Sequence, residues 1–197
     1  MAKRLFDIIM SLFGLIVLSP VILVVAIIIK ADSKGHVFYR GQRIGKNGKP
    51  FRMFKFRTMV QNADKIGGPS TSADDPRLTK IGLFLKKYQL DEVPQLFDVL
   101  RGTMSLVGPR PEVKIYTDMF TEEERKIILS VRPGMTDLAS LWDFHEAELL
   151  NGAEDPEKEY MEKIRPNKLK LQQEYVKKMS FTGDIKIIFQ TVLKILK

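Results

Sequence analysis

The sequence predicts a mostly helical α+β protein that is attached to a membrane near its N-terminus. Three features lead to this prediction: an uncharged apolar run at residues 8–29, a segment of alternating pattern at 36–57, and several capped or amphipathic helical segments after residue 80. We expect residues 1–31 to form a membrane helix and residues 32–197 to form one folded domain, since 197 residues suit a single domain.

The first element is the apolar run, which carries no charged residue over 22 positions and is long enough to cross a bilayer as a helix. A signal peptide is disfavoured because no small-residue cleavage site ends the run. A buried core helix is disfavoured because apolar residues surround the whole helix, which is unusual in so small a chain. The run therefore favours a helix in lipid.

Two features bear on how this helix meets the membrane. Ser19 and Pro20 lie at its middle, and a proline inside a helix removes a backbone hydrogen bond and bends the axis. Basic residues flank both ends, with Lys3 and Arg4 before the run and Lys30 after it, which favours both ends on the cytoplasmic side. We favour a re-entrant helix that bends at Ser19-Pro20, with a kinked spanning helix as the alternative.

The next element is a basic β-hairpin. Between residues 34 and 59 there are eight Lys or Arg residues and no acidic one. Asn47-Gly48 is the favoured turn dipeptide, and residues 51–56 alternate with period two. The hairpin would lie close to the membrane, where part of its charge would face anionic lipid.

The remaining chain reads as a loop followed by helices. Residues 61–77 are rich in turn residues, and we favour an acidic turn over a metal site for Asp74 and Asp75. Helices are expected up to about residue 90, over 121–131 with a capping box, over 156–178, and as a basic amphipathic helix over 184–197. The last helix would lie on the membrane or pack on the domain.

Composition limits the function. The formal net charge is +8, which calls for an anionic partner: nucleic acid, lipid headgroups or a phosphorylated substrate. No nucleic-acid-binding motif appears, so we expect no nucleic acid partner. The chain has no cysteine, and His36 and His145 are its two histidines, which argues against a thiolate or His-rich metal site.

The strongest chemical signal is the acidic pair Asp91-Glu92 in LDEVPQL. A helix is expected to start near this pair because Pro94 is tolerated only in a first turn. An ordinary helix cap is one interpretation. The other follows from Lys86 upstream and Arg110 downstream, because carboxylates among cations can hold a metal-bound phosphate and attack it.

The segments LDEVPQL and DVLRGTMSLVGPRP resemble the core of the small monotopic phosphoglycosyl transferases of the bacterial sugar transferase family. HVFYRGQRIGKNGKPFRMFKFRTM and the N-terminal Lys-Arg-x-Phe-Asp are also similar to that family. The resemblance implies that Asp91 and Glu92 are catalytic and hold Mg²⁺. It further implies phosphate-binding and pocket residues. The expected phosphate contacts are Lys55, Arg77, Lys86 and Arg110, and the expected nucleotide or sugar contacts are Pro109, Pro111, Arg132 and Thr136.

Some positions depart from the family pattern. Lys86 stands where Arg is usual and keeps the charge but not a bidentate grip. Gly41 replaces a usual Gln, and Asp137 replaces a Gly in the RPGxTG-like loop, whose following GRN-like segment is absent. Trp142, Phe144 and His145 are expected to line the sugar pocket or to pack in the core. These departures bear on which sugar is bound more than on which reaction is catalysed.

The resemblance implies transfer of a sugar-1-phosphate from a UDP-sugar to polyprenyl (undecaprenyl) phosphate through a phosphosugar on Asp91, with release of UMP. The expected location is the cytoplasmic face of a bacterial inner membrane, with membrane lipids as partners. The oligomeric state stays open, and a homodimer is one alternative. A different class stays open: a membrane-anchored polyanion- or lipid-binding module without chemistry. That alternative explains the charge and the anchor, but not the acidic pair among cations.

Overall fold

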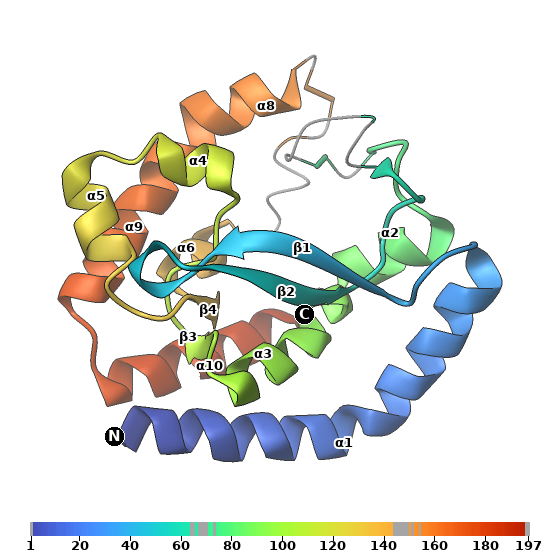
Figure 1. Ribbon diagram of the computed structural model, residues 1–197, viewed down its shortest axis with the longest axis horizontal. Helices are drawn as coiled ribbons and strands as arrows, with labels where there is room; N and C mark the ends of the chain where they lie inside the picture. The colour runs from blue at the N-terminus through green and yellow to red at the C-terminus, as the bar shows by residue number, and fades with distance from the viewer. Residues whose placement is uncertain are drawn as a thin grey trace.

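A computed structural model describes residues 2–63, 66, 71–72, 74–143, 150, 152–153 and 155–195. The described part is mostly helical with two small sheets, which confirms the predicted α+β class (Figure 1). In chain order the elements are α1 (Ala2–Asp32), β1 (Phe38–Ile44), η1 (Lys46–Gly48), β2 (Pro50–Phe56), α2 (Lys80–Lys87), η3 (Leu90–Gln95), α3 (Leu96–Arg101), β3 (Ser105–Val107), α4 (Lys114–Asp118), α5 (Glu122–Ile128), β4 (Gly134–Thr136), α6 (Leu138–Trp142), α8 (Pro156–Glu159), η4 (Tyr160–Ile164), α9 (Arg165–Lys177) and α10 (Phe181–Ile195).

Helix α1 runs along one edge of the molecule and then bends away at an angle (Figure 1). Pro20 lies inside the helix, and a proline is the usual cause of such a bend. The helix is long and apolar enough to cross a membrane, and only 11% of its most apolar window is buried. A core helix of a soluble protein would be mostly buried, so this interpretation is excluded. Whether α1 re-enters or spans the membrane stays a prediction.

The N-terminal half of α1 is tied to the rest of the protein by polar contacts. Arg4 Nη1 donates to the carbonyl oxygen of Val99 in α3 at 2.6 Å. The buried carboxylate of Asp7 accepts a hydrogen bond from Ser105 Oγ in β3 at 2.8 Å. The basic and acidic residues that precede the apolar run therefore fix α1 against α3 and β3.

Strands β1 and β2 form the predicted antiparallel hairpin, in which Phe38 lies opposite Phe56 and Ile44 opposite Pro50. Asn47 and Gly48 in the connecting turn have φ of 58° and 74°, the left-handed conformation that an Asn-Gly turn requires. The hairpin has two faces with different surroundings because side chains alternate along a strand.

The second sheet was not predicted. Strands β3 and β4 pair in parallel, with Ser105 opposite Gly134 and Val107 opposite Thr136. Each strand has only three residues, too few to show an alternating pattern. Gly134 lies so close to Gly108 that a Cβ there would be 2.1 Å from the Gly108 nitrogen.

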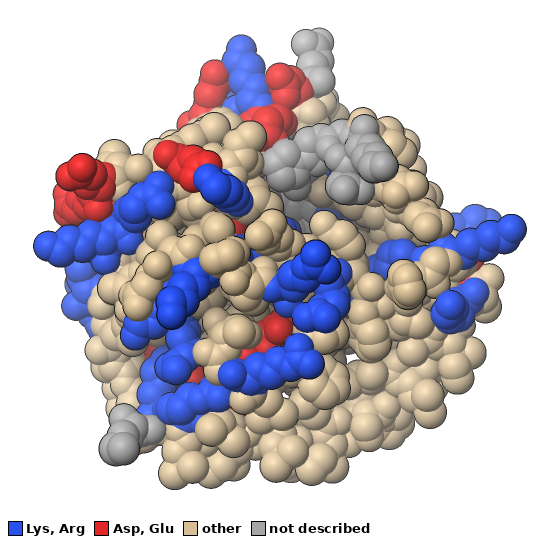
Figure 2. Space-filling model, viewed as in Figure 1, with Lys and Arg blue, Asp and Glu red and all other residues tan. Residues whose placement is uncertain are grey.

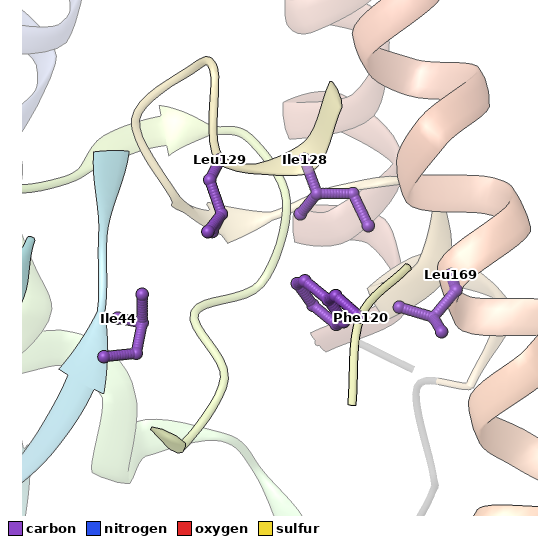
Figure 3. Close-up of a cluster of buried hydrophobic side chains, with 5 residues drawn as sticks. All are labelled: Ile44, Phe120, Ile128, Leu129 and Leu169. Atoms are coloured by element: carbon purple, nitrogen blue, oxygen red, sulfur yellow. The ribbon is translucent and has the colours of Figure 1, made fainter. Parts of the chain in front are cut away.

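Two buried apolar clusters support the region between the hairpin and the helices. One joins β1 to α5 and α9 (Figure 3) and consists of Ile44, Phe120, Ile128, Leu129 and Leu169. The other packs the distal half of α1 against β2 and α2 and consists of Val25, Ile29, Phe56 and Leu85. The hairpin is thus fixed from both sides.

The later helices follow the prediction in outline. The capping box of Thr121 and Glu124 is present at α5. The segment expected to be one helix over 156–178 is divided into α8, a π-helical turn η4 and α9. In α10, Ile187 is buried against the domain while Ile185 and Phe189 are exposed, so this helix packs on the domain and still presents an apolar face outward.

Candidate active site

The acidic pair lies in the short 3₁₀ helix η3, between α2 and α3. Gln89 has φ of 52°, a left-handed conformation that turns the chain out of α2 just before the pair. The predicted helix start near Asp91 is confirmed to within one residue, since η3 begins at Leu90 and continues through Pro94 into α3. The 3₁₀ geometry places both carboxylates beside strand β2.

Glu92 is held by two cations. Lys55 Nζ donates to Glu92 Oε1 at 2.7 Å, and Arg110 donates from Nη1 to Glu92 Oε2 at 3.2 Å and from Nη2 to Oε1. Burial alone would raise the pKa of Glu92, but the charges of Arg110 and Lys55 outweigh it and hold that pKa well below its usual range. Glu92 is therefore ionised at neutral pH and serves as the anchor of both cations.

Asp91 has a different environment. Asp91 is 6% exposed, and its Oδ2 lies 3.7 Å from Lys55 Nζ. Burial raises the pKa of Asp91 above its usual value, and the charge of Glu92 adds to this, while Lys55 acts in the opposite direction. No hydrogen bond to the Asp91 carboxylate is present among the described residues, so this group is the more available of the two for a ligand.

Both carboxylates open into a pocket of about 990 Å³ between the hairpin, α2 and α4. This volume is at the upper end of the range for small-molecule sites and suits a ligand of nucleotide-sugar size. The pocket wall combines cations with apolar and aromatic side chains. Among its lining residues are Tyr39, Arg43, Lys55, Leu83, Phe84, Lys86, Asp91, Glu92, Gln95, Arg110, Pro111 and Tyr116.

The structure brings all four predicted phosphate-binding residues to the wall of this pocket. Lys55, Lys86 and Arg110 line it, and all three act electrostatically on Asp91. Arg77 also lines it, but its guanidinium is paired with Asp75, with Nε 2.9 Å from Oδ1. Asp75 also accepts from the Arg77 backbone N–H at 2.9 Å, which is the expected acidic turn.

The predicted nucleotide or sugar contacts are divided between this pocket and other parts of the structure. Pro111 lines the pocket, whereas Pro109 faces a separate small hollow. Arg132 is exposed and donates from Nε to the carbonyl oxygen of Gly102 at 2.7 Å. The hydroxyl of Thr136 pairs with that of Thr191 in α10 at 2.8 Å. The structure thus does not bring Arg132 and Thr136 to the pocket that holds Asp91.

For the aromatic candidates the outcome is mixed. Trp142 is 47% exposed, so it does not pack in the core. Phe144 and His145 lie outside the described residues.

Arg43 is a pocket residue that the sequence analysis did not single out. It lines the wall from β1, and Tyr39 on the same strand lies directly opposite Lys55. Residues two apart on a strand share a face, so Tyr39, Gly41 and Arg43 face the same side as Lys55. This alternation, applied to the register set by the Asn-Gly turn, is the signal that identifies Arg43.

The fit of Mg²⁺ can be tested on the donor set. Among the described residues there is no group of three or more His, Cys, Asp or Glu side chains that could hold a metal. Mg²⁺ at phosphate sites commonly takes one or two carboxylates, with substrate phosphates and water as further ligands. The Asp91 carboxylate fits such a site. Both Glu92 oxygens already accept hydrogen bonds from cations, which disfavours a metal ion there, and the predicted role of Glu92 as a metal ligand stays a prediction.

Comparison with known proteins identifies the family to which the chain belongs. Residues 1–197 match the family model described as bacterial sugar transferase. The chain is 40% identical over 198 residues to the UDP-glucose:undecaprenyl-phosphate glucose-1-phosphate transferase of Klebsiella pneumoniae, covering 98% of this chain and 39% of that protein. It is 34% identical over 198 residues to the UDP-N-acetylgalactosamine-undecaprenyl-phosphate N-acetylgalactosaminephosphotransferase of Aeromonas hydrophila, covering 98% of this chain and 43% of that protein.

A third relative is similar in length. The exopolysaccharide production protein PSS of Rhizobium leguminosarum bv. phaseoli is 38% identical over 199 residues, with 97% of this chain and 93% of that protein covered. The chain thus spans about two-fifths of the first two relatives and nearly all of the third. With a family match over the whole chain, the protein belongs to the bacterial sugar transferase family.

Proposed function

We propose that this protein transfers a sugar-1-phosphate from a UDP-sugar to undecaprenyl phosphate or a related polyprenyl phosphate. Family membership supports the reaction type, and the Klebsiella and Aeromonas relatives are named for UDP-sugar donors and an undecaprenyl phosphate acceptor. The pocket supports it physically, because it combines cations for a diphosphate with an adjoining apolar helix for a lipid.

The observation that carries the proposal is the division of labour between the two carboxylates. Glu92 binds Lys55 and Arg110, while Asp91 faces the pocket without a hydrogen bond from the described residues. In the first step, an Asp91 oxygen bonds to the sugar-bearing phosphorus and the bond from that phosphorus to the bridging oxygen breaks. UMP leaves with the bridging oxygen and its electron pair.

In the second step, a phosphate oxygen of the polyprenyl phosphate attacks the phosphorus of the phosphosugar on Asp91. The bond between that phosphorus and the Asp91 oxygen breaks, which frees the carboxylate and forms a polyprenyl diphosphate sugar. Both steps bring anions together, and Lys55, Lys86 and Arg110 reduce the repulsion. With so low a pKa, Glu92 is a poor proton carrier at neutral pH and acts by holding the cations.

We infer that Mg²⁺ takes part, held by Asp91 and substrate phosphates, with Glu92 as a further ligand if a cation moves aside. When bound, the ion would neutralise charge on the diphosphate.

The acceptor is a lipid, so the proposed location is a bacterial inner membrane, with α1 re-entrant from the cytoplasmic face. An exposed apolar helix next to a cationic pocket supports this location. A non-catalytic polyanion-binding module is the second candidate, and it would bind anionic vesicles without releasing UMP from any UDP-sugar.

Asp91→Asn tests the proposal. We expect UMP release from a panel of UDP-sugars with undecaprenyl phosphate to fall by about 10³-fold or more, because the amide cannot serve as the nucleophile. Intact-mass measurement of the native protein with donor alone should detect a sugar-phosphate adduct that the variant lacks. Asp118→Asn, at an exposed carboxylate, is the matched control. Near-native UMP release by Asp91→Asn would rule out the covalent step, and no release by native protein would favour the binding module.

A further inference from the structure

Arg57 follows strand β2 and grips the end of α1. Its guanidinium Nη1 donates to the carbonyl oxygen of Lys34 at 2.6 Å. Its Nη2 donates to the carbonyl oxygen of Ser33 at 2.7 Å, to Ser33 Oγ at 2.9 Å and to the carbonyl oxygen of Ile29 at 3.3 Å. Ile29 lies in the last turn of α1, and Ser33 and Lys34 directly follow the helix. The C-terminal end of a helix carries partial negative charge, so a cation is favoured there.

This contact, here called the Arg57 clasp, is buried and specific. Arg57 is 9% exposed, and no ion pair joins it to a described carboxylate. A buried arginine without a carboxylate is costly unless most of its N–H groups are hydrogen-bonded. Here the carbonyl groups of Ile29, Ser33 and Lys34 accept from Nη1 and Nη2, while Nε has no hydrogen-bond partner among the described residues.

Gly35 makes room for the clasp. It has φ of 126°, which L side chains rarely adopt, and a Cβ at this position would lie 2.0 Å from Arg57 Nη1. Two independent constraints therefore require glycine where the chain leaves α1. Gly35, three residues after the end of α1, therefore leaves the space that the Arg57 guanidinium occupies.

The clasp also connects α1 to the acidic pair. The backbone N–H of Arg57 donates to the carbonyl oxygen of Val37 at 2.9 Å, which continues the hairpin by one residue beyond β2. Lys55, two residues earlier and within β2, binds Glu92 at 2.7 Å. One extended segment thus holds the end of the apolar helix at one point and Glu92 at the other.

We propose that Arg57 is a positioning residue that locks the end of α1 onto the strand carrying Lys55 and so sets the height of the acidic pair above the bilayer. This inference rests on the proposed function, because height affects turnover only when the acceptor phosphate arrives in a membrane. A displacement of about 1 Å at a reacting centre can cost 10²-fold in rate.

The position of α1 can be measured without activity. The native chain has no cysteine, so Asp32→Cys and Lys46→Cys give two unique spin-label sites, both exposed, at the end of α1 and in the hairpin turn. In lipid nanodiscs, double electron–electron resonance should give a narrow distribution of the distance between the two spin labels in the parent protein. Arg57→Gln and Gly35→Ala should each broaden it, and Arg52→Gln, at an exposed arginine of β2, should leave it unchanged.

The effect on turnover is measured with two acceptors. With undecaprenyl phosphate in nanodiscs, we expect Arg57→Gln and Gly35→Ala to lower turnover about 10-fold or more. With a short-chain polyprenyl phosphate in detergent, which need not arrive at a fixed height, we expect a loss of less than about 3-fold and an unchanged KM for the UDP-sugar. Arg57→Lys should recover only part of the loss, because an ammonium lacks the planar fork.

Each outcome decides something. An unchanged distance distribution in Arg57→Gln overturns the inference, as does an equal loss with both acceptors, which would make Arg57 part of the general scaffold. Absence of transfer by the native protein with every donor and acceptor defeats the proposed function instead, and the distance distributions then still decide whether the clasp holds α1.

Discussion

At the scale of single residues, the structure gives two adjacent carboxylates opposite surroundings. Glu92 has a lowered pKa because the attraction of Arg110 and Lys55 exceeds the effect of burial. Asp91 has a raised pKa because burial and the charge of Glu92 exceed the attraction of Lys55. Two groups separated by one peptide bond can therefore take different roles.

This difference predicts a pH effect. The Asp91 carboxyl must lose its proton to attack phosphorus, so UMP release should fall as the pH drops through its raised pKa. Glu92→Gln removes a negative charge next to Asp91 and removes the ion pair with which Glu92 holds Lys55, so that Lys55 can pair with Asp91 instead. The pKa of Asp91 should then decrease, and the acidic limb of the pH–rate profile should move to lower pH. Single-turnover UMP release against pH measures this shift.

The same variant should lower the maximal rate, since Lys55 and Arg110 lose their shared anchor. Glu123→Gln, at an exposed glutamate, is the control and should leave the profile unchanged. A limb that moves to higher pH in Glu92→Gln would contradict the electrostatic account.

The sequence predicted site residues best where one local motif fixes their positions. LDEVPQL placed Asp91 and Glu92 correctly at a helix start, and Lys55, Lys86 and Arg110 line the same pocket. Arg132 and Thr136 could not be placed in this way. Their orientation depends on the three-residue strand β4 and on α10, which is remote in the chain.

At the scale of elements, close backbone contacts hold α2 against the segment that follows β2. Thr79 caps α2 by accepting from the Gly82 N–H at 3.0 Å, and its own N–H donates to the Thr58 carbonyl oxygen at 2.9 Å. A Cβ on Gly82 would lie 1.9 Å from that same oxygen. Position 82, in the first turn of α2, therefore has room for glycine only.

Gly82→Ala should therefore destabilise the fold. Forcing a methyl group against backbone should cost about 2 kcal/mol, which corresponds to a decrease in Tm of roughly 4–8 °C for a protein of this size. Thermal unfolding in detergent, followed by Trp142 fluorescence, measures the change. Lys80→Ala, exposed on the same helix, should leave Tm within about 1 °C. An unchanged Tm in Gly82→Ala would show that α2 can move away from Thr58.

Elements were predictable where their signal is local. The Asn-Gly turn and period-two pattern identified the hairpin, and Thr121 with Glu124 identified the start of α5. The parallel pair of β3 and β4 was missed because its partners are far apart in the chain and each strand is short. The π-helical turn η4 likewise has no sequence signal that separates it from an α-helix.

At the scale of the whole molecule, charge and apolar surface are separated. Lys and Arg side chains gather over the middle of one face, while its lower border, along α1, is largely free of charged groups (Figure 2). Leu5, Ile9, Phe13 and Ile16 are exposed on α1. This arrangement is typical of a protein that inserts one edge into lipid and holds its basic surface near the headgroups.

The re-entrant topology predicts that both ends of α1 lie on the same side of the membrane. Ala2→Cys and Asp32→Cys, made separately in the cysteine-free chain, should both react with an impermeant maleimide in inverted membrane vesicles. Neither should react in intact spheroplasts, and Lys46→Cys in the hairpin turn is the control that reports the side on which the folded domain lies. Reaction of the two ends from opposite sides would establish a spanning helix.

The ties between α1 and the domain also set an order of events during biosynthesis. Arg4 finds its acceptor 95 residues later, Asp7 its donor 98 residues later, and Lys3 pairs with Asp184 only after 181 residues. A ribosome delivers the chain from its N-terminus, at a rate of about 5–20 residues per second. α1 is therefore synthesised many seconds before its partners, and its contacts with α3, β3 and α10 can form only after those elements have been translated.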